Sequence, residues 1–432
     1  MRLPRLLAAA LIIGVPSALP GIVGAWQAAP AASSPTQPAY VGTPYAPRPG
    51  RTPPSVDQLT TIGRAMFFDK TLSVNGRVAC ASCHDPAFAF GPSNSAAVQP
   101  GVNARARGFR ATPSLRYLHS LPPFSEHHFD NEGDDSIDLG PTGGHTWDGR
   151  ASSAHEQARL PLLSPDEMGN ANEAAVVRKL ERTPYAAQMR TAFGADVFAD
   201  SAQAFAAATM ALEVFQQSPR EFYPYSSRYD AVLRGRATLT PREARGLALF
   251  NDPAKGNCAS CHLSTPTPDG AFPLFTDFGH IAIGVPRNDG LRANDNPRFF
   301  DLGLCGPLRT DFTGKPEAAE YCGRFRTPSL RNVALRKVFF HNGAVRSLDE
   351  AVRFYATRDT DPRHWYARDS RGRVLRYDDL PRRYRGNVNT EPPFGGRPGL
   401  PPVLNDSEIG DIVAFLRTLT DADLDAAPLP KH

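Results

Sequence analysis

The chain has 432 residues, of which 41% are hydrophobic, so it is long and apolar enough for one large or two ordinary domains, which argues against global disorder. Its formal charge is only +4, and no lysine- or arginine-rich run alternates with aromatic residues. This pattern argues against nucleic acid as a partner.

The N-terminus has the pattern of a secretory signal, which we place at residues 1–29. Arg2 and Arg5 precede an apolar stretch from Leu6 to Val15, and small residues follow it. We expect export to the periplasm, with an uncleaved membrane anchor as the alternative, because the apolar stretch continues beyond Val15. Residues 30–54 are rich in proline, alanine, serine and threonine and are predicted to form a flexible linker.

The pentad Cys-Ala-Ser-Cys-His occurs twice, beginning at Cys80 and at Cys258. C-x-x-C-H is the attachment signature of c-type haem, in which two thiols add to the porphyrin vinyl groups and the histidine ligates the iron. A zinc site would need further ligands nearby, and a redox C-x-x-C needs no histidine. We therefore predict two covalent haems c, held by Cys80, Cys83 and His84 and by Cys258, Cys261 and His262.

The segments that precede the two pentads both predict helices. Residues 62–69 and 244–252 place apolar residues at helical spacing and end in an aromatic residue and an acid. Residues 406–420 predict a further helix with one apolar face. We expect a mainly α-helical protein of two cytochrome c-like domains with one haem each, an N-terminal haem domain at 55–238 and a C-terminal haem domain at 239–432.

The two remaining cysteines, Cys305 and Cys322, have no histidine beside them. In an oxidising compartment, a local disulfide that closes a loop rich in turn residues is the expected state. A third metal site is the alternative.

Two longer motifs accompany the pentads. WDGRASSAHEQARLPLLSPDEM (Trp147–Met168) follows the first, and FRTPSLRNVALRKVFFHNGAVRSLDEAV (Phe325–Val352) follows the second. From about residue 55 onward the chain resembles the bacterial di-haem cytochrome c peroxidase superfamily, and GLCGP with YCG resembles its MauG-type branch. The resemblance implies that hydrogen peroxide reacts at the N-terminal haem and that the C-terminal haem relays electrons.

The resemblance also assigns roles to single residues. It implies that Trp147 couples the two haems, that Glu167 is the acid–base residue over the peroxide site, and that Gln157 is its polar neighbour. Splitting peroxide requires a proton to move between its oxygens, which a carboxylate within reach can do, so chemistry also supports Glu167. The alternatives are ordinary core packing for Trp147 and a helix N-terminal charge for Glu167.

The first departure from the family pattern concerns the first haem. Standard peroxidases carry a second histidine ligand shortly after the first pentad, but residues 85–118 contain no histidine. We expect an open sixth position on this iron. The alternative is a ligand from a later histidine in an apparent surface loop, that is, from His119, His127, His128 or His145.

Two further departures concern the second haem and calcium. Tyr355 stands fourteen residues after His341, where standard peroxidases have methionine and the MauG-type branch has tyrosine. The resemblance to the MauG-type branch implies that Tyr355 ligates the second iron, and such a ligand is a main determinant of haem potential. An ordinary helix aromatic is the alternative. Ala111 replaces the asparagine of the family's calcium site, which leaves calcium an open question.

The motifs together favour a peroxidase that takes electrons from a small donor protein, a cytochrome c or a cupredoxin. The alternative is a MauG-type oxidation of residues on a partner protein. A third hypothesis is that the protein is a non-catalytic electron-transfer cytochrome. The acid at Glu167 and the histidine-free stretch argue against it, because neither is needed when peroxide does not bind.

Overall fold

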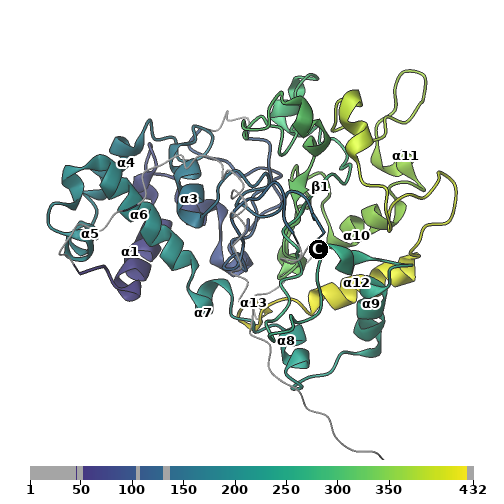
Figure 1. Ribbon diagram of the computed structural model, residues 1–432, viewed down its shortest axis with the longest axis horizontal. Coiled ribbons are helices and arrows are strands. Elements are labelled where there is room, and N and C mark those ends of the chain that lie inside the picture. The colour runs from purple at the N-terminus through teal and green to yellow at the C-terminus, as the bar shows by residue number, and fades with distance from the viewer. Residues whose placement is uncertain (1–44, 46–51, 104–107, 130–136, 426–432) are drawn as a thin grey trace, which may run out of the picture. The chain divides into compact units, whose positions relative to one another are not determined.

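The computed structural model describes residues 45, 52–103, 108–129 and 137–425 (Figure 1). The predicted signal and most of the predicted linker lie outside these residues. The described chain is mainly helical, and none of its helices is long and apolar enough to cross a membrane. Its α-helices are α1 (Val56–Phe68), α2 (Cys80–Cys83), α3 (Ala154–Leu163), α4 (Glu173–Leu180), α5 (Ala186–Phe193), α6 (Ser201–Gln216), α7 (Pro219–Phe222), α8 (Arg228–Leu233), α9 (Pro241–Asn251), α10 (Leu348–Thr357), α11 (Pro362–Trp365), α12 (Asp406–Arg417) and α13 (Ala422–Asp425).

The helices expected before the pentads and near the C-terminus are α1, α9 and α12, the last of which ends at Arg417 rather than Thr420. Each begins with a capping box, at Ser55, Thr240 and Asn405 respectively. These side chains accept a hydrogen bond from a backbone N–H of the first turn that has no partner inside the helix. Local sequence therefore fixes where the three helices start.

Two helix pairs of the same design form the centres of the fold, α1 against α6 and α9 against α12 (Figure 1). A Cβ atom on Gly63 of α1 would lie 2.0 Å from the carbonyl oxygen of Ala211 in α6. A Cβ atom on Gly246 of α9 would lie 2.0 Å from that of Asp411 in α12. Only glycine permits so close an approach of two backbones, so each pair has the same requirement at its crossing.

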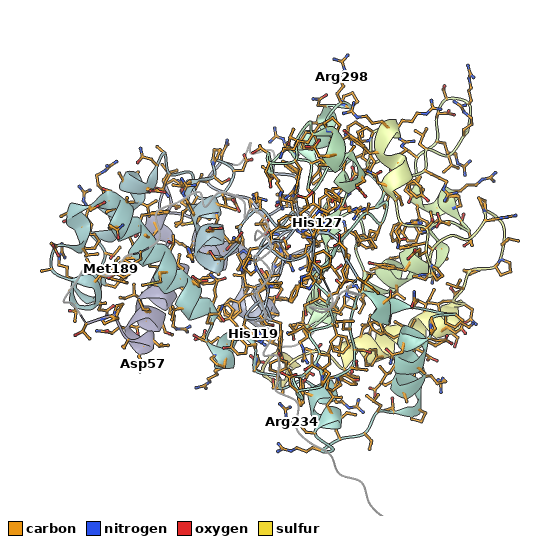
Figure 2. All side chains as sticks on the ribbon, in the orientation of Figure 1. Asp57, His119, His127, Met189, Arg234 and Arg298 are labelled. Atoms are coloured by element: carbon orange, nitrogen blue, oxygen red, sulfur yellow. A yellow bond between two sulfur atoms is a disulfide. The ribbon has the colours of Figure 1, made fainter. Side chains whose placement is uncertain are left out.

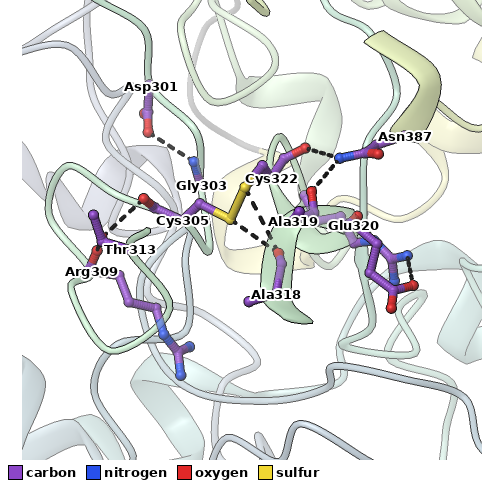
Figure 3. The surroundings of a disulfide bond; sticks show 11 residues. Asp301, Gly303, Cys305, Arg309, Thr313, Ala318, Ala319, Glu320, Cys322 and Asn387 are labelled. Carbon is purple, nitrogen blue, oxygen red and sulfur yellow. Dashed lines mark hydrogen bonds and ion pairs between the residues drawn. A yellow bond between two sulfur atoms is a disulfide. The ribbon is translucent and has the colours of Figure 1, made fainter. Parts of the chain in front are cut away.

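The buried apolar residues form two large clusters and a small one. The first cluster runs from Leu59 to Phe222 and the second from Tyr229 to Leu419. The third surrounds Cys305 and Cys322, which a disulfide joins over a Cα–Cα distance of 5.0 Å (Figure 3). β1 (His280–Ile281) pairs antiparallel with β2 (Phe325–Arg326). The division at residues 238 and 239 stays a prediction.

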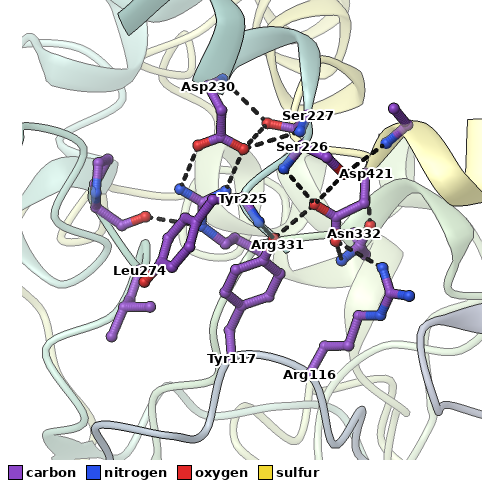
Figure 4. A network of polar contacts seen from close by, with 12 residues as sticks. Arg116, Tyr117, Tyr225, Ser226, Ser227, Asp230, Leu274, Arg331, Asn332 and Asp421 are labelled. Atoms are coloured by element: carbon purple, nitrogen blue, oxygen red, sulfur yellow. Dashed lines mark hydrogen bonds and ion pairs between the residues drawn. The ribbon is translucent and has the colours of Figure 1, made fainter. Parts of the chain in front are cut away.

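A buried polar network connects segments of the two large clusters (Figure 4). Arg116 donates to Asp421 at 2.8 Å, and Arg331 donates to both oxygens of Asp230 at 2.9 Å. Tyr117 also donates to Asp421, at 2.6 Å. Removal of one partner from such a buried pair leaves an uncompensated charge, so the network restricts how the segments can pack.

Candidate haem-binding site

The histidine of each pentad is held by the same contact. His84 Nδ1 lies 2.9 Å from the carbonyl oxygen of Phe90, and His262 Nδ1 lies 2.9 Å from that of Phe275. When Nδ1–H donates to a carbonyl, Nε2 carries the lone pair that binds a metal. Burial lowers the pKa of His84 to about 4 and also lowers that of His262, so both rings are neutral near pH 7. Both are therefore prepared as iron ligands.

The loops behind the two histidines share one hydrogen-bond pattern. The amide of Leu115 donates to Phe90 and that of Leu330 to Phe275, each at 3.3 Å. One residue earlier, the Ser114 hydroxyl donates to Ala89, as the Ser329 hydroxyl donates to Leu274, each at 2.6 Å. The repeated letters TPSLR, at 112–116 and 327–331, build both loops. Our sequence analysis missed this repeat, although it was readable.

A cavity of about 220 Å³ brings the second pentad together with two predicted site residues. Its lining includes Cys258, Cys261 and His262, and also Tyr355 from α10 and Trp147. Burial, followed by the two nearby thiols, raises the pKa of Tyr355 above its ordinary value. In the protein alone Tyr355 is therefore a neutral phenol. A neutral histidine, two thiols and a phenol around one cavity fit a covalently attached haem, which Cys258, Cys261 and His262 would hold with Tyr355 nearby.

The first pentad forms α2, and its two thiols are neutral. Burial is the main cause that raises the pKa of Cys80 to about 12 and that of Cys83 to about 11, and the carboxylate of Glu167 is a further cause in both. The structure therefore brings Glu167 to the first pentad, although 83 and 167 are far apart in sequence. No such effect connects Glu167 with the second pentad.

Glu167 lies in the turn between α3 and α4, so it is not the helix N-terminal charge considered as an alternative. Its amide donates to Ser164 at 3.1 Å, and its carbonyl accepts from Val102 at 2.8 Å. Its side chain is exposed, yet burial raises the pKa of its carboxyl. Exposure and a raised pKa occur together when water reaches one side of a carboxyl while the surrounding protein atoms disfavour its charge.

Trp147 and Gln157 occupy different surroundings. Trp147 is 9% exposed, and its Nε1–H donates to the carbonyl oxygen of Ala111 at 2.7 Å. It thus links the cavity of the second pentad to the loop that packs behind the first. Gln157 lies on α3, half-buried, and is not hydrogen bonded to Glu167. The structure therefore supports a bridging position for Trp147 and shows no direct contact between Gln157 and Glu167.

The later histidines have different surroundings. His127, labelled in Figure 2, is about half exposed, and its Nδ1 lies 2.7 Å from Asp138. The His119 ring stacks on Tyr223 with centroids 3.9 Å apart. His145 is buried, and burial lowers its pKa to about 3. His128 is half-buried. These contacts do not decide whether a histidine ligates the first iron, so the open sixth position stays a prediction.

The region around Ala111 shows what stands at the family's calcium position. The Ala111 amide donates to His341 at 2.6 Å, and its carbonyl is the acceptor for Trp147. The neighbouring Arg110 pairs with Asp148 and Asp301 at 2.6 Å. Within the described ranges, no group of three or more histidine, cysteine, aspartate or glutamate side chains is arranged to hold a metal ion. Calcium stays an open question.

Comparison with known proteins agrees with this site. The family model of di-haem cytochrome c peroxidases matches residues 57–238. The methylamine utilization protein MauG of Paracoccus denitrificans is 33% identical over 387 residues, which cover 85% of this chain and 90% of that protein. The crystal structure of the diheme peroxidase BthA from Burkholderia thailandensis has a TM-score of 0.75 and 44% identity, covering 88% of this chain and 87% of that one.

A third solved relative is a MauG-like protein associated with microbial copper homeostasis, with a TM-score of 0.60, 28% identity and coverage of 92% of this chain and 98% of that one. These matches define the class of protein as a haem-dependent oxidoreductase that uses two haem cofactors. The chain belongs to the di-haem cytochrome c peroxidase family and, within it, to the MauG-type branch.

Proposed function

We propose that the chain reduces hydrogen peroxide at an N-terminal haem with electrons relayed through a C-terminal haem. Each peroxide takes up two electrons and two protons and leaves as two waters. The observation that carries the proposal is the asymmetry of the two pentads. A carboxyl, Glu167, interacts with the first pair of thiols, whereas a phenol, Tyr355, shares the cavity of the second.

In this proposal, each cytochrome c-like domain attaches one haem covalently, through Cys80 and Cys83 in the first and through Cys258 and Cys261 in the second. His84 and His262 are the proximal ligands. The repeated helix pair and the repeated TPSLR loop support one haem in each half. The bound haems supply the redox chemistry, and the side chains described next position the reactants and move protons.

Glu167 is proposed to take a proton from one peroxide oxygen and return it to the other, which then leaves as water. The carboxyl must be ionised to accept the proton. Desolvation by the surrounding protein raises its pKa, so its carboxylate is a stronger base than that of an ordinary glutamate. Gln157 is proposed as a polar neighbour that orients peroxide. Trp147 is proposed to couple the haems, which its contacts on both sides support.

A second candidate function is the MauG-type oxidation of residues on a partner protein. Tyr355 in the cavity of the second pentad favours it, because a hard anionic oxygen bound to the iron would stabilise its oxidised states and would make the second haem a poor electron store. The likeness to MauG also supports it. The greater identity with a diheme peroxidase supports peroxide reduction as the first candidate. The proposed electron donor is a cytochrome c or a cupredoxin.

We also propose that the protein works in the periplasm. The N-terminal signal pattern supports export. The disulfide between Cys305 and Cys322 supports an oxidising compartment, where such bonds persist.

Stopped-flow spectroscopy tests the proposal. Purified ferric protein is mixed with peroxide, first alone and then with a reduced small cytochrome c. We expect the ferric protein to react at once and the cytochrome to be oxidised over many turnovers. A reaction that appears only after half-reduction contradicts the open site on the first haem. Peroxide consumption without cytochrome oxidation, together with oxidised residues on a partner protein, favours the second candidate.

A further inference from the structure

Arg326 is a buried cation that has no carboxylate partner. The buried arginines of the described chain are Arg116, Arg309, Arg326, Arg331 and Arg358. All of them except Arg326 form an ion pair with a carboxylate. The pairs are Arg116 with Asp421, Arg309 with Asp311, Arg331 with Asp230, and Arg358 with Asp359. Since this protein pairs its other buried guanidinium groups, the exception indicates a negative charge that the polypeptide does not supply.

The contacts of Arg326 leave part of its guanidinium unused. Its Nε donates to the carbonyl oxygen of Thr146 at 3.2 Å, and its amide donates to that of Trp147 at 2.8 Å. Its Nη1 is buried without a hydrogen-bond partner. Burial lowers the pKa of Arg326 to about 10, so the group remains charged at neutral pH. An unpaired charge in this position is strongly unfavourable unless an anion binds.

The position of Arg326 in the cavity lining indicates which anion would bind to it. Arg326 lines the same cavity as His262 and Tyr355. A haem attached at the second pentad would occupy that cavity, and every haem carries two propionate carboxylates. A guanidinium is the side chain best suited to bind a carboxylate, because its donors match the spacing of the two oxygens.

Arg336 repeats the situation toward the first pentad. It lines the cavity and forms no ion pair with any described carboxylate. Its side chain donates to the carbonyl oxygens of Thr112 at 3.3 Å and Val338 at 3.2 Å. Burial lowers its pKa to about 10, and its charge is one of the causes that lower the pKa of His84. Arg336 is therefore a half-buried cation without a carboxylate partner, next to the loop that packs behind the first pentad.

We propose that Arg326 binds a propionate of the second haem, that Arg336 binds a propionate of the first, and that each cation thereby sets the reduction potential of its haem. The inference rests on the proposed binding of one haem at each pentad. A positive charge near a haem stabilises the reduced form, which carries one negative charge more than the oxidised form. Arg326 also holds the backbone of Trp147, so its charge acts where the two haems are proposed to be coupled.

The test is spectroelectrochemical titration of holoprotein carrying Arg326→Gln or Arg336→Gln. We expect Arg326→Gln to lower the equilibrium constant for reduction of the second haem about tenfold, the scale of one charge at an effective dielectric constant near 20. For one electron this is about 59 mV. The first haem should change little. Arg336→Gln should lower the equilibrium constant for reduction of the first haem and should change that of the second haem little. If both potentials match the wild-type values in Arg326→Gln, the proposal is wrong.

Arg324→Gln is the matched control, because it removes the same charge two residues earlier, from a side chain that pairs with Glu320 at the surface. It should leave both potentials unchanged. Should Arg326→Gln fail to retain haem, Arg326→Lys keeps the charge but not the planar fork. In the Arg326→Lys protein, the haem propionate bending band in the resonance Raman spectrum should shift relative to the wild-type band. An unchanged band overturns the proposal. Intact mass is measured for each protein, and a wild-type mass without two haems overturns the proposed function as well.

Discussion

Glu167 is the residue whose surroundings most directly suggest a chemical role. Glu167→Gln should slow the reaction of the ferric protein with peroxide by about 100-fold or more, the scale of a positioned proton-transfer group. Because burial raises the pKa of Glu167, the wild-type rate should fall as the pH decreases through that raised pKa, where the carboxylate becomes protonated and can no longer accept a proton. Stopped-flow measurements across pH give both results.

The adjacent Asp166 provides a control for this experiment. Asp166→Asn removes the same charge one residue earlier, from a half-buried side chain, and should leave the rate above the pKa of Glu167 nearly unchanged. Because the charge of Asp166 is the last of the causes that raise the pKa of Glu167, the fall in rate should move slightly to lower pH in this variant. Equal effects of the two substitutions would indicate a general electrostatic role. If the fall in rate at low pH disappears in Glu167→Gln but not in Asp166→Asn, that fall is due to protonation of Glu167.

Tyr355 is the second residue whose substitution separates two interpretations. If its oxygen binds the second iron, Tyr355→Phe should open the sixth position and change the spin state, while Tyr355→Met should raise the midpoint potential, since a soft neutral ligand favours reduced iron. Electron paramagnetic resonance and potentiometry measure these effects. Tyr366→Phe is the control, because Tyr366 is buried in the same half and donates to Gly284 instead. An unchanged second haem in Tyr355→Phe leaves Tyr355 a packing residue.

At the scale of elements, the close helix contacts at Gly63 and Gly246 allow a quantitative prediction. Gly63→Ala places a methyl group where the carbonyl of Ala211 lies, so α1 and α6 must move apart. We expect a loss of about 1–3 kcal/mol in the free energy of unfolding, the usual cost of overpacking, measured by urea denaturation. Gly386→Ala is the control, because a Cβ there meets no atom within 4 Å. A cost below that of the control would show that the helices adjust freely.

At the scale of the whole molecule, the buried ion pairs connect segments that the sequence places far apart. Arg116→Met leaves Asp421 without its cation and should cost about 3–5 kcal/mol. Arg373→Met breaks an ion pair whose arginine is 72% exposed and should cost less than about 1 kcal/mol. Denaturant unfolding of both variants checks the contrast. Similar costs would mean that the network of Figure 4 contributes little to stability.

The mass of the molecule tests the cofactor assignment as a whole. Covalent attachment at both pentads predicts that the denatured protein keeps two haems in intact-mass spectrometry. Replacing Cys80 and Cys83 by alanine should remove one haem, and replacing Cys258 and Cys261 should remove the other. A wild-type mass without haem, or with only one, contradicts the assignment.

The sequence by itself determined the local features. Apolar residues at helical spacing predicted α1, α9 and α12, and the capping boxes of the structure lie within the same short segments, because helix starts depend on contacts within a few residues. The pentads predicted the residues that hold the haems, since both thiols and the histidine stand within five positions. The tyrosine at 355 and the motifs around it identified the branch of the family that the comparisons then confirmed.

Only the tertiary structure decided which distant residues meet. It brought Glu167 to the first pentad and Tyr355 to the second cavity, and it placed Glu167 in a turn rather than at a helix start. It also showed that Arg326 is buried without a carboxylate partner, which no local pattern reveals. Burial and ion pairing depend on the whole packed chain, because water and distant carboxylates are excluded or admitted by elements that come together only on folding.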